Sequence, residues 1–163
     1  MQTNNNGATD AEMQEFANQS IKQLGFLLLL NAPEGMQFGI DNQYWQTGPR
    51  FSGVKMIPPG SHFVYFALKD EQYASRLGFF IHVPKLNTAA TDTDRRQESV
   101  IVRVWDPHMQ AFIRLPTEAE ECAYQEGVLN MDFDGQLGCY PLKNHRQWHQ
   151  LVDYIDEGVL GRI

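Results

Sequence analysis

Two rigid corners enclose one short segment of this chain and restrict its fold more than any other sequence feature. Gly48-Pro49 precedes residues 51–57, and Pro58-Pro59-Gly60 follows them. Proline presets φ and glycine accepts positive φ, so each corner predicts a tight change of chain direction. The segment between the corners is therefore predicted to be one short strand.

Comparable strand and turn signals recur along most of the chain. Residues 26–30 form an apolar run that is much shorter than the about 20 residues needed to cross a bilayer, which predicts a strand buried on both faces. Asn31-Ala32-Pro33-Glu34-Gly35 has the composition of a turn. The predicted strands are 26–30, 36–40, 51–57, 62–68, 76–83, 99–106 and 111–115. This spacing is typical of a sandwich or a partly open barrel.

Helical patterns lie towards the two ends of the chain. Residues 10–24 repeat apolar side chains at helical spacing. Thr117 and Glu120 match a capping box, which predicts a helix that stops at Gly127. Residues 143–157 form a third such pattern, whose apolar stripe is Trp148, Leu151, Val152 and Ile155.

These patterns together predict a mainly β fold with peripheral α-helices. Residues 1–9 are polar and are expected to form a disordered tail. Residues 10–163 are expected to form a single β-rich, β-sandwich-like domain with an N-terminal helix and two C-terminal helices.

Composition and termini exclude several classes of function. The net charge is −7, which disfavours general binding to nucleic acid and favours basic protein partners. Residues 1–7 have neither the charged nor the apolar part of a signal peptide, so we expect a protein of the cytoplasm and nucleus with no membrane contact.

Motifs for catalysis are not found in this sequence. It contains no Walker or dinucleotide loop, no G-x-S-x-G elbow and no H-E-x-x-H helix. Cys122 and Cys139 are far apart, lack an obvious basic partner and are expected to be free thiols. We therefore expect no enzyme activity and no cofactor.

One alternative is a cupin-like metal or small-ligand module. Cupin-type barrels place an H-x-H pair on a strand after such a turn, and here His62 follows Pro58-Pro59-Gly60. Val64 occupies the second position, so His82 on another predicted strand would have to face His62. The pattern favours the simpler interpretation, in which each histidine is a half-buried strand residue bonded to a backbone carbonyl.

A second alternative is an RNA binder, in which the aromatic side chains of Trp45, Phe79 and Phe80 stack on bases. The negative charge of the chain argues against this alternative.

Several side chains near the two corners have predicted structural roles. Asp41 is expected to bond backbone amides two or three residues further on, and Trp45 to cover the exposed end of the sheet. Strand alternation predicts one face with Phe51, Gly53, Lys55 and Ile57, and the other with Val54 and Met56. Lys55 would then lie between apolar neighbours, and either pairs with Asp41 or extends to water.

The chain from Phe26 to Ile155 closely resembles the N-terminal domain of the a-one-cistron splicing factor family. The shared elements are an apolar strand, N-x-P-x-G, F-G-I-D, a tryptophan, G-P-x-F-x-G-V-K-M-I-P-P-G-x-H-F, a G-F-F strand, L-G-x-Y-P and a helix with a tryptophan. The residues that carry the resemblance are Gly39, Ile40, Asp41, Trp45, Gly48, Pro49, Phe51, Gly53, Lys55, Pro58, Pro59, Gly60, His62, Phe63, Gly78, Phe79, Phe80, Tyr140, Pro141 and Trp148.

The resemblance implies a non-catalytic role in pre-mRNA splicing. Members of this family are assembly chaperones of the U5 small nuclear ribonucleoprotein and bind its largest core protein. The resemblance also implies a helical domain after the β-rich one, and the sequence ends at Ile163, where that domain is expected to begin. The matching residues are expected to determine the fold first and to contact a partner second.

Overall fold

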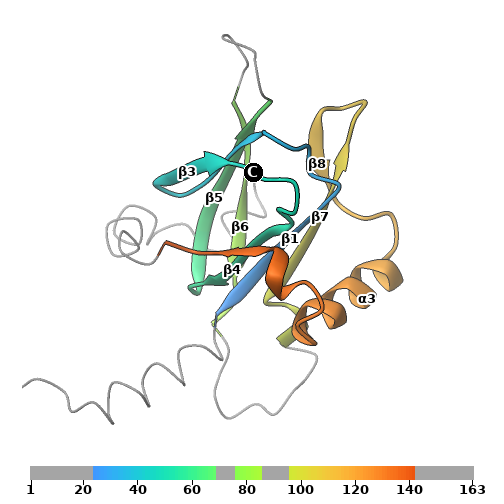
Figure 1. Cartoon of the computed structure of the whole chain (residues 1–163). Coiled ribbons are helices and arrows are strands. Elements are labelled where there is room, and N and C mark those ends of the chain that lie inside the picture. The colour runs from blue at the N-terminus through green and yellow to red at the C-terminus, as the bar shows by residue number, and fades with distance from the viewer. Residues whose placement is uncertain (1–23, 69–75, 86–95, 142–163) are drawn as a thin grey trace, which may run out of the picture.

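A computed structural model describes residues 24–68, 76–85 and 96–141, which form two β-sheets and one α-helix (Figure 1). The first sheet has the strand order β8 (Ala111–Ile113), β7 (Val100–Asp106), β1 (Gly25–Leu30), β4 (Gly53–Ile57) and β9 (Leu137–Cys139). The second has the order β3 (Gln43–Gln46), β2 (Gln37–Ile40), β5 (Gly60–Ala67) and β6 (Leu77–Val83).

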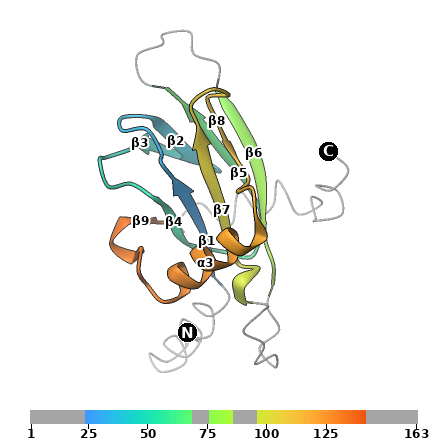
Figure 2. The same ribbon diagram turned by 90° about the vertical axis from the view of Figure 1, so that its right-hand side faces the viewer.

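The prediction of a mainly β, sandwich-like fold is confirmed for these residues. The two sheets lie against each other (Figures 1 and 2), and their facing side chains form the main core. The predicted tail at 1–9 and the predicted helices at 10–24 and 143–157 fall outside the described residues. No helix among the described residues is long and apolar enough to span a membrane.

Strand β1 is buried on both faces, as its apolar run predicts. It pairs in parallel with β7 and antiparallel with β4. Leu27 and Leu29 point into the core between the sheets. Leu28 points to the opposite face, into a second apolar cluster that includes Val128 of the helix. Period-2 alternation thus places each leucine of β1 in one of two separate cores.

A β-bulge in β4 overturns the predicted pattern of faces. Gly25 pairs with Ile57 and Phe26 pairs with Lys55, which leaves Met56 as an extra residue with a φ of 63°. An inserted residue reverses the alternation beyond it. Ile57 therefore joins Val54 in the main core, and the predicted shared face of Lys55 and Ile57 is wrong.

Two short strands were not predicted. Strand β3 carries Trp45, whose ring lies 5.5 Å from that of Phe38 and 6.4 Å from that of Phe51. Strand β9 pairs in parallel with β4 at the edge of the first sheet. Both strands have only three or four residues, too few for a clear alternation of apolar and polar side chains.

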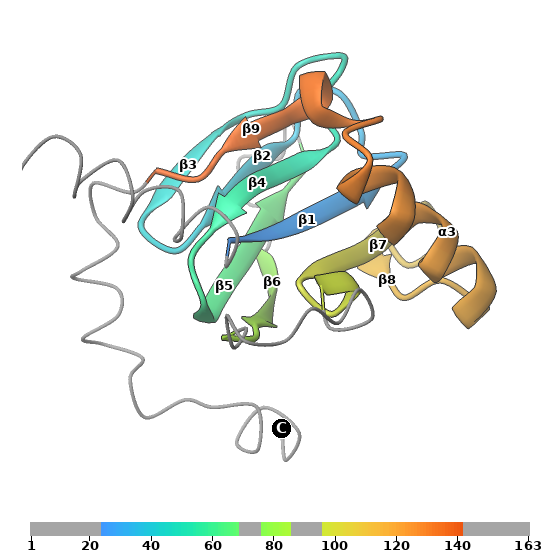
Figure 3. The same ribbon diagram turned by 90° about the horizontal axis from the view of Figure 1, so that it is seen from below.

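Helix α3 (Glu118–Leu129) lies against β7, beside the first sheet (Figure 3). Its start agrees with the predicted cap, because Thr117 Oγ1 accepts a hydrogen bond from the amide of Glu120 at 3.3 Å. The predicted stop at Gly127 is wrong. A Cβ atom at this glycine would lie 3.0 Å from the ring of Phe133, so its small size here serves packing.

The helix ends at Leu129, two residues after Gly127, in a Schellman motif. The amide of Asp132 donates to the carbonyl of Gly127, and the amide of Met131 donates to that of Val128. Met131 has a φ of 66°, in the left-handed region where glycine is usual. The chain then passes through a short 3₁₀ helix, η1 (Asp134–Gln136), into β9.

Candidate functional site: a buried polar network between the sheets

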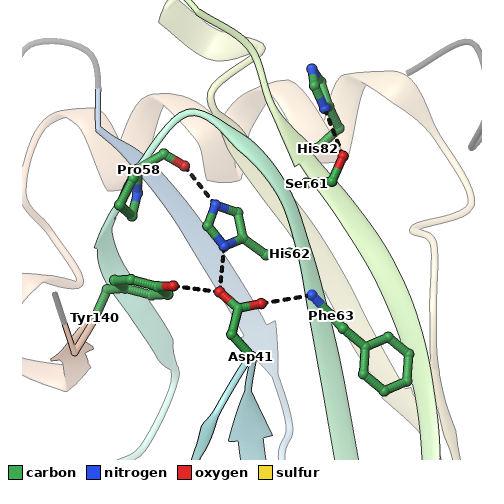
Figure 4. Close-up of polar contacts among 7 residues, drawn as sticks. All are labelled: Asp41, Pro58, Ser61, His62, Phe63, His82 and Tyr140. Atoms are coloured by element: carbon green, nitrogen blue, oxygen red, sulfur yellow. Dashed lines mark hydrogen bonds and ion pairs between the residues drawn. The ribbon is translucent and has the colours of Figure 1, made fainter. Parts of the chain in front are cut away.

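Three polar side chains, those of Asp41, His62 and Tyr140, meet in the interior of the protein (Figure 4). Asp41 follows β2, His62 belongs to β5 and Tyr140 follows β9. His62 Nδ1 lies 2.6 Å from Asp41 Oδ2, and the hydroxyl of Tyr140 donates to the same oxygen. Only 1% of the His62 side chain and 3% of the Asp41 side chain are exposed, so the contacts form away from water.

Both ring nitrogens of His62 are used inside the protein. Nε2 lies 2.6 Å from the carbonyl oxygen of Pro58, which only accepts hydrogen bonds, so Nε2 carries a hydrogen and donates it. Nδ1 shares a second hydrogen with Asp41. The expected hydrogen bond from a strand histidine to a backbone carbonyl is thus confirmed for His62. The expected half-burial is wrong, because the side chain is fully buried, and both of its ring nitrogens are bonded within the protein.

The backbone and side chain of Asp41 both bind β5. Its Oδ1 accepts from the amide of Phe63 at 2.9 Å, and its own amide donates to the carbonyl of Phe63 at 2.8 Å. The predicted bonds to amides two or three residues further on are therefore replaced by a partner 22 residues away. Asp41 has a φ of 55°, a conformation that aspartate tolerates better than most residues.

Tyr140 connects this network to the first sheet. Its amide donates to the carbonyl of Lys55 in β4 at 2.9 Å. Its ring meets that of His62 edge-on, with centroids 5.3 Å apart. Burial, followed by the hydrogen bond to Asp41 and the negative charge of that carboxylate, raises the pKa of the Tyr140 hydroxyl well above its ordinary value. The hydroxyl therefore stays protonated and acts as a donor.

The network is arranged as a clamp between the sheets. Asp41 follows β2 and His62 lies in β5, both strands of the second sheet, whereas Pro58 and Tyr140 follow strands of the first. The described residues contain no buried side-chain nitrogen or oxygen without a hydrogen-bond partner. A fully satisfied buried network of this kind specifies one packing arrangement. Its donors and acceptors face one another, so the arrangement serves structure.

The cupin-like pairing of His62 with His82 is wrong. In the β5–β6 register His62 is opposite Ile81, and His82 is opposite Ser61. Adjacent strand residues point to opposite faces, so the two imidazoles lie on different sides of the sheet. His82 Nδ1 instead lies 3.3 Å from the hydroxyl oxygen of Ser61. Within the described ranges, no cluster of three or more histidine, cysteine, aspartate or glutamate residues is suited to a metal ion.

The alternative in which Lys55 pairs with Asp41 is also wrong. Lys55 Nζ lies 3.0 Å from Asp134 Oδ1 and donates to the carbonyl of the same residue at 3.3 Å. The bulge at Met56 and the parallel pairing of β4 with β9 bring Lys55 beside the residues that precede β9. Cys122 and Cys139 are free, as expected, and both are exposed.

A family model for the AAR2 N-terminal domain matches residues 23–163. The chain belongs to the AAR2 family. Over 149 residues it is 32% identical to the Protein AAR2 homolog of Caenorhabditis elegans, and over 153 residues it is 31% identical to that of Mus musculus and 29% identical to that of Homo sapiens. Each match covers 91% of this chain.

The chain spans little more than a third of the length of these relatives. The matches cover 37% of the nematode protein and 36% of the mouse and human proteins. The matched part of the AAR2 family proteins is therefore the β-rich domain described above, together with residues on either side of it.

Among the AAR2 family motif residues, Gly53 has the clearest structural cause. Its φ is 134°, and a Cβ atom there would lie 1.8 Å from the carbonyl oxygen of Leu27. The backbone of β4 thus approaches β1 at a point where no side chain fits. Gly60, at the second corner, also has a positive φ of 121°.

Gly39 and Gly78 make room for aromatic rings on the outer face of the second sheet. A Cβ atom at Gly39 would lie 2.1 Å from the ring of Tyr65, and one at Gly78 would lie 2.4 Å from that of Phe63. Phe63 stacks on Tyr65 at 6.0 Å and contacts Phe80 at 5.0 Å. These motif residues therefore build one aromatic face.

The remaining motif residues are divided between the core and the surface. Ile40 and Pro58 are buried; Phe51, Pro59 and Pro141 are partly exposed; Gly48 and Pro49 are exposed; Trp148 lies outside the described residues.

The predicted stacking platform of Trp45, Phe79 and Phe80 is not formed. Trp45 and Phe79 pack against the main core, whereas Phe80 lies on the outer face with Phe63.

Sequence reasoning missed Thr47, which is 4% exposed. Its hydroxyl accepts from the amide of Met36 and donates to the carbonyl of Pro33, both at 3.0 Å. These bonds fix the turn after β1. A lone threonine just before Gly48-Pro49 gives no local signal for this role, because its partners precede it by 11 and 14 residues.

Proposed function

We propose that this chain is a protein-binding domain of a non-catalytic assembly factor, or chaperone, for the U5 small nuclear ribonucleoprotein in pre-mRNA splicing. Its proposed partner is the largest core protein of that particle. The observation that carries the proposal is the match of residues 23–163 to the AAR2 N-terminal domain. Because the chain corresponds to about a third of its relatives, binding to the partner is proposed for the whole protein.

The polar network supports a binding role over a catalytic one. A catalytic centre needs groups that reach the substrate with a free donor, acceptor or nucleophile. Here both nitrogens of His62 and the hydroxyl of Tyr140 are directed at protein oxygens in the interior. The network thus serves a rigid scaffold, and a rigid scaffold lowers the entropic cost of binding another protein.

The charge of the chain supports a protein partner. A net charge of −7 opposes direct contact with the phosphate backbone of RNA and favours basic protein surfaces. We propose that the protein works in the cytoplasm and nucleus without a cofactor, direct nucleic-acid contact or membrane contact.

The experiment that tests this proposal is affinity purification of the full-length gene product from nuclear extract, followed by quantitative mass spectrometry. The U5 proteins, with the largest core protein foremost, are expected to be enriched over an unrelated acidic control protein of similar size. A folded full-length protein that enriches no U5 protein above this control would contradict the proposal. Digestion with ribonuclease before purification separates contact through RNA, in which case enrichment is lost, from direct contact, in which case it persists.

A further inference from the structure

An open groove lies between α3 and the end of the first sheet. It encloses about 570 Å³ and is lined by β1, β7, the β8–α3 connection, α3 and the residues that follow α3. It is remote in the fold from the buried network, which joins the opposite strands β4 and β9 to the second sheet.

The floor of the groove is apolar. Leu30 and Val104 are register partners on neighbouring strands, and Leu115 lies beside them in the chain segment before α3. All three side chains are partly exposed. Further along the same face of the first sheet, α3 covers Leu28 and Val102. The groove lies at the part of this face that α3 does not cover.

One wall of the groove is aromatic. The rings of Tyr124 and Phe133 are 6.2 Å apart, and both are partly exposed. Gly127 lies between them in the chain and lacks a side chain that would fill the space. An aliphatic or aromatic side chain that enters the groove therefore meets apolar atoms on the floor and on this wall.

The rim of the groove is acidic. Glu120 and Asp132 both line it and are exposed. Neither forms an ion pair with another described residue. Helix α3 carries four glutamates and no lysine or arginine along its described length. Glu120 and Asp132 thus present negative charge above an apolar floor.

We propose that this groove binds an extended segment of a partner protein that inserts one large apolar side chain between Tyr124 and Leu30 and places lysine or arginine against Glu120 and Asp132. The apolar surface of the groove would hold the large apolar side chain of the partner segment, and the two carboxylates would favour a positively charged residue beside it. The inference rests on the proposed protein-binding function and specifies the chemistry of one partner segment.

A phage-displayed library of random peptides, selected on the immobilised full chain, tests the groove directly. Enriched peptides are expected to combine a large apolar residue with flanking lysine or arginine. A parallel selection uses the charge-reversed variant Glu120→Lys, Asp132→Lys, for which peptides with aspartate or glutamate are expected. Glu118→Lys is the matched control, because Glu118 lies on the same helix but does not line the groove, and it is expected to select the same peptides as the unchanged chain.

The affinity of the best basic peptide gives a second measure. Reversing the two rim charges is expected to weaken its binding by about three- to tenfold, the range for two exposed ion pairs, and Glu118→Lys to leave it within about twofold. The groove proposal is overturned if no peptide is enriched, if charge reversal leaves the selected composition unchanged, or if Glu118→Lys changes it equally. Recovery of U5 proteins together with such a result would overturn this site alone and leave the proposed function standing.

Discussion

The Nδ1 atom of His62 lies 2.6 Å from Oδ2 of Asp41, inside a sandwich whose two sheets are joined at this contact by Tyr140 and Pro58. The His62–Asp41 pair has the same residue types as part of a catalytic triad, but its imidazole is not open to a nucleophile. A triad presents one imidazole nitrogen to a nucleophile, whereas here the second nitrogen donates to a backbone carbonyl. The same residue types here form a closed set of hydrogen bonds inside the protein.

Replacing Asp41 by asparagine is expected to destabilise the protein by about 2–4 kcal/mol, because the amide nitrogen would face the donors of His62 or Tyr140 in a dry environment. The free energy of unfolding in urea, monitored by circular dichroism, checks this value. Asp134→Asn is the matched control: its ion pair with Lys55 is at the surface, with the Asp134 side chain 40% exposed, and its loss is expected to cost less than about 1 kcal/mol. Equal losses for the two variants would show that the buried pair contributes no more than the surface pair.

Tyr140→Phe is expected to cost about 1–2 kcal/mol at neutral pH, since it removes one buried donor to Asp41 and keeps the ring. The effect should change sharply with pH. The folded state raises the pKa of Tyr140, so the folded protein retains this proton while the unfolded chain releases it above about pH 10. The stabilisation is therefore complete below the unfolded pKa and declines as pH rises above it. The urea unfolding midpoints of the unchanged protein and of Tyr140→Phe are measured at pH 8, about 10 and about 11, and the difference between them is expected to shrink as the pH rises. A difference that stays constant would contradict the role of the Tyr140 hydroxyl as a buried donor.

Gly53→Ala is expected to destabilise the protein by at least about 3 kcal/mol or to prevent folding, because the new Cβ atom would overlap the carbonyl oxygen of Leu27 and φ is 134°. Gly135→Ala is the comparison, since a Cβ atom there meets nothing within 4 Å, and its effect should remain within about 0.5 kcal/mol. Urea unfolding measures both, and the loss of any cooperative transition in Gly53→Ala counts as agreement. A small effect at Gly53 would show that β4 and β1 can separate without loss of the fold.

Met131→Gly is expected to stabilise the protein by about 0.5–1 kcal/mol. Met131 occupies the left-handed position that closes α3 and is 66% exposed, so the substitution relieves strain without removing a buried side chain. Thermal unfolding compares the variant with Met109→Gly, at a methionine that is similarly exposed and has no positive φ. A loss of stability in both variants would contradict the strained cap.

The strands of this domain were largely predictable because their apolar side chains face a continuous core. The strand at residues 26–30 could be predicted from its own sequence alone. A strand that is buried on both faces has apolar residues at every position, and this run does. The bulge at Met56 was not predictable, because a methionine in a left-handed conformation has no local sequence signal and is imposed by the pairing with Gly25 and Phe26. That single residue reversed the face of Ile57.

The sequence indicated which residues form the candidate site, but not which of them contact one another. Asp41, His62 and Tyr140 all lie in the motifs that indicated the family, yet Tyr140 is 99 residues from Asp41 in the chain. The sequence pattern assigned Asp41 to its own turn and offered it as a partner for Lys55, because strand alternation placed Lys55 between apolar neighbours. The sheet order decides the outcome, since β9 beside β4 brings Tyr140 to the buried carboxylate and Asp134 to Lys55.

The most direct test measures whether a change in the buried network alters binding to the proposed partner. The full-length gene product and its Tyr140→Phe variant, both confirmed as folded by circular dichroism, are used to recover the largest U5 core protein from nuclear extract at neutral pH. The account predicts equal recovery within about twofold, because the hydroxyl stabilises the scaffold and touches no partner. Recovery by neither protein, or loss of recovery in a folded Tyr140→Phe variant, would contradict it.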